Sequence, residues 1–274
     1  MPRIAIFQAR SGIDPGVNAA ALVDVVERAA MGGAEMLFTP EMSGLLDGNR
    51  DRAAGVVRSE DDDEVLAAVR EAARANAIWV HLGSLALRGE DDKLVNRAFV
   101  IDPAGAIAGH YDKIHLFDVD LPTGESWRES AAYQAGTVPV VVRGTPVGTL
   151  GLTICYDLRF AAIFERLSEA GAELIAVPAA FTVPTGKAHW HVLLRARAIE
   201  AGLFVVAAAQ SGQHEDGRAT FGHSLVVDPW GEVLVDGGEG EKLLFAEIDL
   251  MRIAEVRSRI PVLQHRRVIG SVSD

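Results

Sequence analysis

The sequence contains a single cysteine, Cys155, so no disulfide can form within the chain. Its longest apolar run, residues 203–209, is far shorter than the roughly 20 residues that a membrane helix needs. Residues 1–3 lead directly into apolar residues 4–7, without the charged segment and long apolar stretch of a secretory signal. These absences predict a water-soluble protein of the reducing cytoplasm.

Basic residues are too few for a protein that binds nucleic acid or a membrane. The chain has 26 Lys and Arg against 38 Asp and Glu, which gives a formal net charge of −12. Such a charge repels phosphate backbones and anionic lipid surfaces. We therefore expect a small molecule as the ligand, and neither nucleic acid nor a membrane as a partner.

Linkers rich in glycine, serine or proline, low-complexity tracts and fixed-period repeats are absent as well. Hydrophobic residues make up 49% of the chain, enough for one large core. Chains usually split into domains only beyond roughly 250–300 residues. We predict a single domain over residues 1–274, with residues 261–274 as a C-terminal tail.

What the sequence does contain is an alternation of short apolar runs with helical patterns, which is typical of an α/β protein. Turn sequences at 102–105, 143–146 and 228–231 add antiparallel hairpins. Runs that are apolar on both faces fit sheets covered on both sides. We predict a four-layer α-β-β-α sandwich. The predicted strands are 4–7, 36–39, 78–82, 96–101, 107–111, 138–142, 147–154, 174–177 and 203–209, and the predicted helices are 18–31, 60–76, 161–170 and 189–201.

An acidic run at residues 60–64 could be taken for a metal site. It directly follows Ser59, however, and serine is a good helix N-cap. Carboxylates in a first helical turn also interact favourably with the helix dipole. We interpret the run as the solvated start of the helix at 60–76, capped by Ser59.

Cys155 ends the apolar strand predicted at 147–154 and precedes a turn and a helix. A side chain at such a turn projects from a rigid strand end, and backbone N–H groups of the turn can face an oxyanion. Cys155 is therefore a candidate nucleophile. The alternative is a small buried core residue, the usual role of a free cysteine.

A nucleophilic thiol with an ordinary pKa of about 8.5 needs a base or a nearby positive charge at neutral pH. None of the eight histidines carries a recognisable local signature with Cys155. Glu41 and Lys113, in contrast, each follow a predicted strand directly. Because α/β proteins place their sites at the carboxyl ends of strands, a carboxylate, an ammonium and a thiol could meet there.

Three segments strengthen this interpretation: FTPEMSG around Glu41, YDKIHLFDVD around Lys113 and GLTICYDLRF around Cys155. In this order they resemble the three catalytic motifs of the nitrilase superfamily of carbon-nitrogen hydrolases, and the resemblance extends from residue 4 to about residue 267. It implies the α-β-β-α sandwich as the fold. It also implies that Glu41, Lys113 and Cys155 are catalytic.

Further segments resemble the deaminated-glutathione amidase and omega-amidase branch: FTVPTGKAHWHVLLRARAIEAGLFVVAAAQ, FGHSLVVDPWGEV and IPVLQHRR. The branch carries a second glutamate after the lysine. We assign it to Glu129 rather than Glu125, because a serine follows Glu129.

The resemblance implies a cysteine-dependent amidase that releases ammonia or an amine through a thioester. Glu41 would act as base and then acid, and Glu129 would position Lys113. Lys113 and the backbone N–H of Tyr156 would stabilise the oxyanion. No metal or organic cofactor is expected, and His189 and His191, two residues apart, point to different sides of a helix.

In the resembling branch the substrate is an α-keto acid with a distal amide, so a cation should receive its carboxylate. Arg159, Phe181 and Thr185 lie in branch-like motifs and are candidate substrate-binding residues. A structural ion pair beneath the catalytic turn is an equal alternative for Arg159, and simple packing is the alternative for Phe181 and Thr185. His189 and Trp190 are expected to pack at a helix start.

The resemblance also implies a homodimer, with higher oligomers open, in which the helix at 161–170 and the tail at 261–274 form the contact. Other activities stay open at this point: omega-amidase action on α-ketoglutaramate, N-carbamoyl amide hydrolysis and nitrile hydrolysis. A catalytically inactive regulatory subunit is the alternative outside the enzymes.

Overall fold

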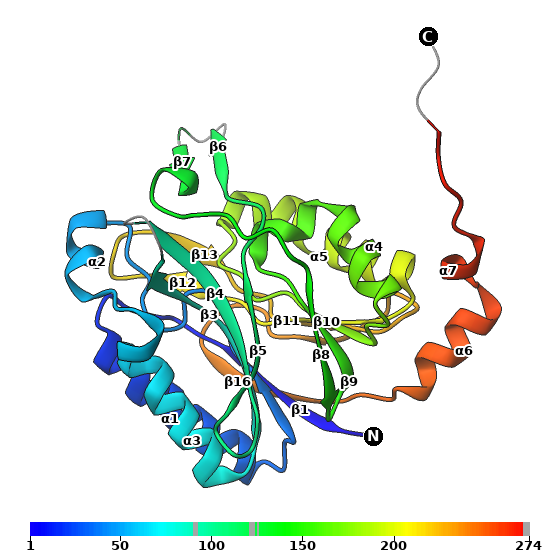
Figure 1. The fold of residues 1–274 in the computed structure, drawn as a ribbon, viewed down its shortest axis with the longest axis horizontal. Helices are drawn as coiled ribbons and strands as arrows, with labels where there is room; N and C mark the ends of the chain where they lie inside the picture. The colour runs from blue at the N-terminus through cyan, green and yellow to red at the C-terminus, as the bar shows by residue number, and fades with distance from the viewer. Residues whose placement is uncertain (90–92, 121–123, 125, 271–274) are drawn as a thin grey trace.

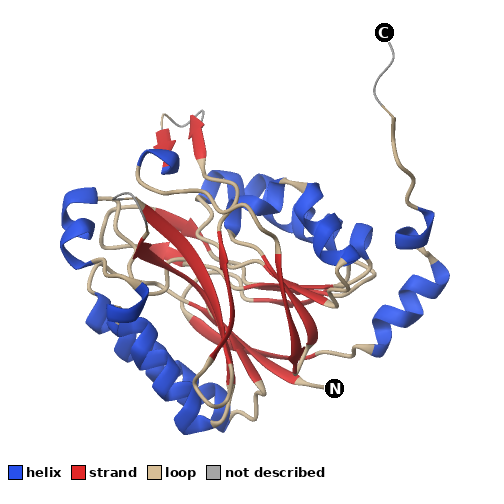
Figure 2. Cartoon of the chain, viewed as in Figure 1, coloured by secondary structure: helices blue, strands red, loops and turns tan. Residues whose placement is uncertain are grey.

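The computed structural model describes residues 1–89, 93–120, 124 and 126–270 of the chain. Figures 1 and 2 show two sheets lying face to face, with helices on their outer sides. The first sheet has the order β16-β1-β2-β3-β4-β5 and the second β15-β14-β11-β10-β9-β8. This arrangement confirms the predicted four-layer α-β-β-α sandwich.

The strands of the first sheet are β1 (Arg3–Gln8), β2 (Met36–Phe38), β3 (Trp79–Arg88), β4 (Leu94–Ile101), β5 (Ile107–Asp112) and β16 (Lys242–Glu247). Those of the second are β8 (Val140–Thr145), β9 (Gly148–Leu152), β10 (Leu174–Ala176), β11 (Phe204–Ala207), β14 (Leu225–Val227) and β15 (Val233–Asp236). The strands β1-β2-β3 and β9-β10-β11 run parallel, and the others pair antiparallel. Each sheet therefore has a central parallel unit whose carboxyl edge can hold a site.

The helices are α1 (Pro15–Met31), α2 (Arg50–Val56), α3 (Glu64–Asn76), α4 (Ala161–Glu169), α5 (Val183–Ala201), α6 (Met251–Arg259) and α7 (Val262–His265). Side chains alternate along β1: Ile4 and Ile6 face the core between the sheets, whereas Ala5 and Phe7 pack in the core beneath α1 and α3. Helices α4 and α5 cover the second sheet (Figure 1).

Two helix starts differ from the sequence prediction. The run after Ser59 forms only a short 3-10 helix, η1 (Glu60–Asp62), and Asp63 caps α3 by accepting a hydrogen bond from the Leu66 N–H at 2.8 Å. Ser59 instead donates its hydroxyl to Asp62. Helix α5 starts at Val183, six residues before the predicted start, because proline fits the first turn of a helix, where its missing N–H costs no bond.

Smaller elements were not predicted from the sequence. They include α2, the 3-10 helices η2 (Glu129–Ala131) and η3 (Cys155–Arg159), and two hairpins, β6 (Asp118–Asp120) with β7 (Ser126–Arg128) and β12 (Ser211–Gln213) with β13 (Ala219–Phe221). Strand β9 ends at Leu152, before the predicted end of its run. Such short elements carry too few residues for a periodic signal.

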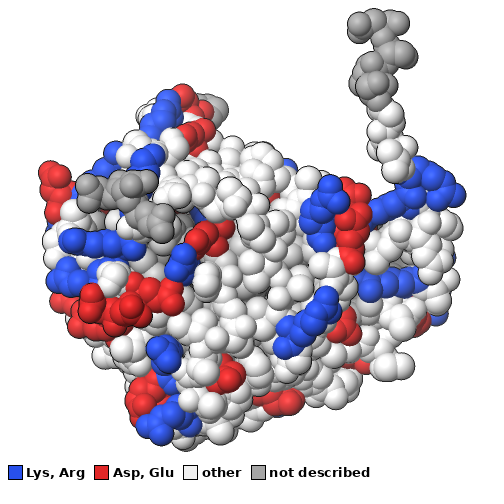
Figure 3. All heavy atoms as spheres, in the orientation of Figure 1, with Lys and Arg blue, Asp and Glu red and all other residues white. Residues whose placement is uncertain are grey.

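Charged side chains of both signs lie interspersed on the face shown in Figure 3, with a largely uncharged area between them. Within the part of the chain that the structure describes, no helix is long and apolar enough to cross a membrane.

Candidate active site

The structure brings Glu41, Lys113 and Glu129 into one buried ion cluster. Glu41 follows β2, Lys113 follows β5 and Glu129 begins η2. The Lys113 Nζ donates to Glu41 Oε1 at 2.9 Å and to Glu129 Oε2 and Oε1 at 2.9 and 3.1 Å. The Lys113 side chain is only 2% exposed, so one ammonium is held between two carboxylates away from water.

Glu129 is itself fixed by the loop that follows Lys113. Its Oε2 accepts a hydrogen bond from the Phe117 N–H at 2.7 Å, and its own N–H donates to the Phe117 carbonyl. Glu125, the alternative considered for the second glutamate, lies outside the described residues. Within the described residues, Glu129 is the second carboxylate that contacts the Lys113 ammonium.

Asn96 on β4 joins the cluster, and the sequence analysis missed it. Its Nδ2 donates to Glu41 Oε1 at 3.0 Å and to Glu129 Oε1 at 3.3 Å, and the residue is fully buried. The available signal was a polar residue beside the apolar run 98–101 in a predicted strand. Asn96 and Lys113 together give both carboxylates hydrogen-bond donors, as polar groups removed from water require.

Cys155 is the first residue of η3 and has a backbone φ of +49°. For a residue other than glycine this left-handed conformation costs about 1–2 kcal/mol. The Cys155 N–H donates to the Pro178 carbonyl at 2.8 Å, which ties the turn to the loop after β10. The thiol thus lies on a sharp turn after the second sheet, as the sequence predicted, although two residues separate that turn from the end of β9.

A buried carboxylate beneath this turn holds the strained backbone in place. Asp157 is fully buried and accepts hydrogen bonds from the Ile154 N–H at 2.8 Å and the Tyr111 hydroxyl at 2.8 Å. It also accepts from the His115 N–H and contacts its ring Nδ1 at 2.7 Å. Asp157 therefore links the Cys155 turn to the segment around Lys113, a role with no signal in the sequence beyond its place in the motif.

The charges around Cys155 keep its thiol protonated. Burial raises the pKa of Cys155 well above its usual range, and the carboxylate of Glu41 raises it further. The Lys113 ammonium and the Ala180 N–H oppose that rise in pKa. Because the thiol is protonated at rest, any thiolate chemistry here requires a base, and Glu41 is the carboxylate that faces the thiol.

The ammonium of Lys113 is firmly protonated. Burial by itself would lower the pKa of Lys113, but the negative charges of Glu129 and Glu41 outweigh it and raise that pKa. The Ala180 N–H, which lies on the loop after β10, also donates to Glu41 Oε2 at 3.0 Å. Both oxygens of Glu41 are thereby oriented.

Arg159 and Phe181 lie together beside Tyr156, the residue that follows Cys155. The Arg159 guanidinium stands 5.7 Å from the Tyr156 ring centroid and 5.5 Å from that of Phe181. Its Nη1 lies 3.2 Å from His189 Nδ1. Among the described residues no carboxylate pairs with Arg159, so the structural ion pair considered from the sequence does not form.

Thr185 is engaged locally at the start of α5. Its hydroxyl lies 2.8 Å from that of Thr182, and both residues are buried. The expected helix-start packing of His189 and Trp190 holds only for Trp190, which is buried and donates its indole N–H to the His223 carbonyl at 2.7 Å. His189 is exposed, because the early start of α5 moves it into the second turn.

Known proteins resemble this chain over nearly its whole length. The deaminated glutathione amidase of Yersinia enterocolitica is 38% identical over 272 residues, 98% of this chain and 94% of that protein. The C. elegans NitFhit structure is 40% identical with a TM-score of 0.89 over 97% of this chain, which spans 65% of that chain. A mutant of the amidase from Nesterenkonia sp. AN1 is 27% identical, with a TM-score of 0.82 over 97% and 94% of the two chains.

The family model described as carbon-nitrogen hydrolase matches residues 3–258. This range contains the three motifs on which the resemblance to the nitrilase superfamily was based, and it confirms that resemblance. The chain belongs to the carbon-nitrogen hydrolase family.

Proposed function

We propose that this protein is an amidase that cleaves the amide of a small α-keto acid through a Cys155 thioester. The observation that carries the proposal is the buried cluster in which Lys113 bridges Glu41 and Glu129 beside the Cys155 thiol. A carboxylate, an ammonium and a thiol meet there, and all three residues are buried. In the amidase from Nesterenkonia sp. AN1, the acetamide moiety of fluoroacetamide adds covalently at the active-site cysteine, which supports a nucleophilic role.

In the first half-reaction Glu41 takes the proton of the Cys155 thiol, and the sulfur attacks the amide carbonyl carbon. The C=O electron pair moves to oxygen, and the Lys113 ammonium and the Tyr156 backbone N–H stabilise that oxyanion. The tetrahedral intermediate collapses as the C–N bond breaks. Protonated Glu41 gives its proton to the leaving nitrogen, so an amine or ammonia departs and a thioester remains.

In the second half-reaction Glu41 accepts a proton from water, and the resulting hydroxide attacks the thioester carbon. The C–S bond breaks, and the sulfur recovers the proton from Glu41. The products are a carboxylic acid and the original enzyme. Throughout the cycle Glu129 and Asn96 hold Lys113 and Glu41 in place, which is a positioning role.

The substrate class rests on Arg159. Arg159 is four residues beyond Cys155 in the sequence, and its guanidinium lies over the rings of Tyr156 and Phe181. It forms no ion pair among the described residues. A guanidinium held in this way can accept a carboxylate through two parallel hydrogen bonds. Relatives named deaminated glutathione amidase indicate an α-keto acid carboxylate as that group. Phe181 would line the same pocket, and Thr185 would support it by fixing the start of α5.

We also propose a cytoplasmic homodimer that forms through α4 and the C-terminal tail. Arg266 anchors the tail to α4 through the Ser168 hydroxyl at 3.2 Å and the carboxylate of Glu165 at 3.6 Å. Beyond it, Val268 and Ile269 are almost fully exposed on a segment that extends from the body (Figure 1). Residues 271–274 of the predicted tail lie outside the described residues. Sedimentation at micromolar concentration tests this proposal, and a clean monomer would overturn it.

The test of function compares two amides with the wild type and Cys155→Ala. Deaminated glutathione joins its keto acid to a cysteinyl amine, so release of cysteinylglycine measures its cleavage, whereas α-ketoglutaramate releases ammonia. We expect Cys155-dependent turnover with deaminated glutathione preferred. Preference for α-ketoglutaramate would indicate an omega-amidase. Activity only on N-carbamoyl compounds or nitriles would overturn the substrate class, and a stoichiometric protein partner without any hydrolysis would indicate a regulatory subunit.

Arg159→Gln tests the carboxylate site separately. Loss of a charge-assisted hydrogen bond should lower kcat/KM for the keto acid about 10- to 100-fold. Turnover of propionamide, which has no carboxylate, should change little. The control is Arg28→Gln on α1, whose side chain is 55% exposed and pairs with Asp24 at the surface. An equal loss on both substrates would show that Arg159 supports the fold rather than the carboxylate.

A further inference from the structure

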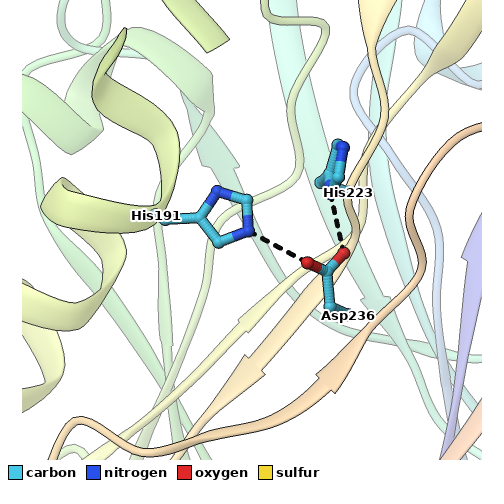
Figure 4. A group of neighbouring side chains, drawn as sticks. All are labelled: His191, His223 and Asp236. Atoms are coloured by element: carbon cyan, nitrogen blue, oxygen red, sulfur yellow. Dashed lines mark hydrogen bonds and ion pairs between the residues drawn. The ribbon is translucent and has the colours of Figure 1, made fainter. Parts of the chain in front are cut away.

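A second polar cluster lies where α5 meets β14 and β15, and it shares no residue with the ion cluster around Lys113. His191 on α5, His223 between β13 and β14, and Asp236 at the end of β15 point toward one another (Figure 4). His191 Nε2 lies 3.0 Å from Asp236 Oδ2, and His223 Nδ1 lies 2.8 Å from Asp236 Oδ1. One potential ligand atom from each residue lies within 4.8 Å of the others.

The His223 backbone is held in an unusual conformation that aims its ring at this point. Its φ is +54°, a left-handed value that is uncommon outside glycine. The His223 N–H donates to the Gly238 carbonyl at 2.7 Å, and its carbonyl accepts the Trp190 indole N–H at 2.7 Å. The ring stacks on Phe221 with centroids 4.4 Å apart. The surroundings therefore fix one imidazole before any ligand arrives.

Asp236 is oriented in a similar way. The Gly238 N–H donates to its Oδ1 at 2.8 Å. Lys242, a cation on β16, donates to the Gly237 carbonyl at 2.6 Å and forms no ion pair with Asp236 among the described contacts. The carboxylate is thus directed at the two imidazoles and is not neutralised by a lysine.

From this arrangement we propose that His191, His223 and Asp236 form a binding site for a divalent transition metal, with Zn²⁺ as the best fit. Two imidazole nitrogens and one carboxylate oxygen form a donor set that Zn²⁺ accepts. Zn²⁺–ligand bonds of about 2.0–2.1 Å place tetrahedral donor atoms about 3.3 Å apart. Small side-chain rotations are therefore enough to bring the three donor atoms to these positions. The side chains are 37%, 24% and 37% exposed, which leaves a fourth position for water.

Metal binding would also change the imidazole tautomers. The Asp236 carboxylate can only accept hydrogen bonds, so His191 Nε2 and His223 Nδ1 each donate an N–H to it when no metal is bound. To bind the metal, His191 must carry its proton on Nδ1 and His223 on Nε2, so that the nitrogens facing Asp236 present lone pairs.

The metal would join α5, the segment between β13 and β14, and β15, and one of their neighbours carries Phe181. The Phe221 N–H donates to the Phe181 carbonyl at 3.0 Å, and Thr182 bridges to Thr220. Linking α5 to β13–β15 would therefore steady the segment that carries Phe181. This role is structural. It is independent of the proposed amidase chemistry. It differs from the expectation of no metal, because the ligand spacing of these three residues along the sequence gives no signal of a site.

The experiment titrates metal-stripped protein with Zn²⁺ by calorimetry and follows its thermal unfolding. The Cys155→Ala variant serves as background, because a thiolate also binds Zn²⁺. We expect saturable binding of one ion per chain and a rise in Tm of about 5 °C or more at a hundredfold excess over Kd. His191→Ala and Asp236→Asn should each weaken binding at least about tenfold.

The matched control is His110→Ala, which removes an exposed histidine on β5 and should leave binding unchanged. Circular dichroism confirms that each variant is folded. Co²⁺ absorption in the visible range provides a second readout of nitrogen and oxygen coordination. Absence of saturable binding in the Cys155→Ala background would overturn the proposal, as would binding that His191→Ala and Asp236→Asn leave intact.

Discussion

At the scale of single residues, the candidate site is organised around the proton of Cys155. Burial and Glu41 raise the pKa of the thiol, whereas Lys113 lowers it. These opposing effects keep the resting thiol protonated while a base stands beside it. The same carboxylate that holds the thiol proton in place can therefore remove it once a substrate arrives.

Glu41→Gln should separate the effect of Glu41 on the pKa of Cys155 from its proposed action as a base. Removal of the negative charge should lower the pKa of Cys155, because Glu41 contributes to its rise. Hydrolysis should nevertheless fall about 10²- to 10⁴-fold, since Glu41 is the proposed general base. The measurements are product release and the pH dependence of Cys155 alkylation by iodoacetamide.

The matched comparison is Lys113→Gln, which removes the charge that lowers the pKa of Cys155 and should shift alkylation to higher pH. Circular dichroism checks that this buried substitution leaves the fold intact. A Glu41→Gln variant that kept its turnover, or whose alkylation moved to higher pH, would contradict the assignment.

At the scale of elements, the turn after β2 depends on a glycine in the neighbouring strand. Strand β3 has a register shift between Leu82 and Leu85, and Gly83 lies within it. The Gly83 N–H donates to the Thr39 hydroxyl at 3.0 Å. A Cβ at this position would collide with the carbonyl oxygens of Thr39 and Pro40, which directly precede Glu41.

Gly83→Ala should therefore displace Glu41. We expect overpacking to lower the unfolding free energy measured in urea by about 1–3 kcal/mol. Activity should fall about 10²-fold. Gly55→Ala in α2 is the control, because its Cβ would meet open space. That change should be neutral or stabilise the helix by up to about 1 kcal/mol. Unchanged activity in Gly83→Ala would show that the turn tolerates the displacement.

The start of α3 allows a second test at this scale. Asp63→Ala removes the side chain that caps the Leu66 N–H, and should cost about 1 kcal/mol of unfolding free energy. Ser59→Ala should stay within about 0.5 kcal/mol, because Ser59 caps no backbone N–H. Urea unfolding of both variants decides between them. A larger loss of unfolding free energy in Ser59→Ala than in Asp63→Ala would show that Ser59 is the cap, as predicted from the sequence.

At the scale of the whole molecule, the core between the sheets contains one conspicuous polar side chain. His81 on β3 is 1% exposed, and neither ring nitrogen has a hydrogen-bond partner within the described part of the chain. Its ring lies 5.6 Å from that of Phe38. Burial lowers the pKa of His81 from 6.5 to about 3, so the imidazole stays neutral in the folded protein.

His81 should make the fold sensitive to acid. Below pH 6.5 the unfolded chain binds a proton at His81 that the folded chain does not bind until about pH 3. The unfolding free energy should therefore decrease as the pH is lowered from about 6.5 to 3, by up to a few kcal/mol in total. His81→Phe should remove this part of the dependence in urea titrations at several pH values. Identical pH slopes in both proteins would contradict this account.

The sequence by itself determined the fold class and the position of the candidate site. Apolar periodicity marked most strands of both sheets and four of the helices, because burial of one face of each element imposes that pattern. Glu41, Lys113 and Cys155 could be singled out because each follows a predicted strand within a family motif. Glu129 could be chosen over Glu125 from its neighbouring serine.

Only the tertiary structure decided which side chains complete these groups. Asn96 meets Glu41 across 55 positions of sequence, and His191 meets Asp236 across 45. Asp157 joins Tyr111 across 46 positions, from one sheet to the other. Such contacts depend on how strands pair and how sheets stack, and a local sequence pattern predicts neither. Single polar residues inside apolar strands therefore gained their meaning only when the layers came together.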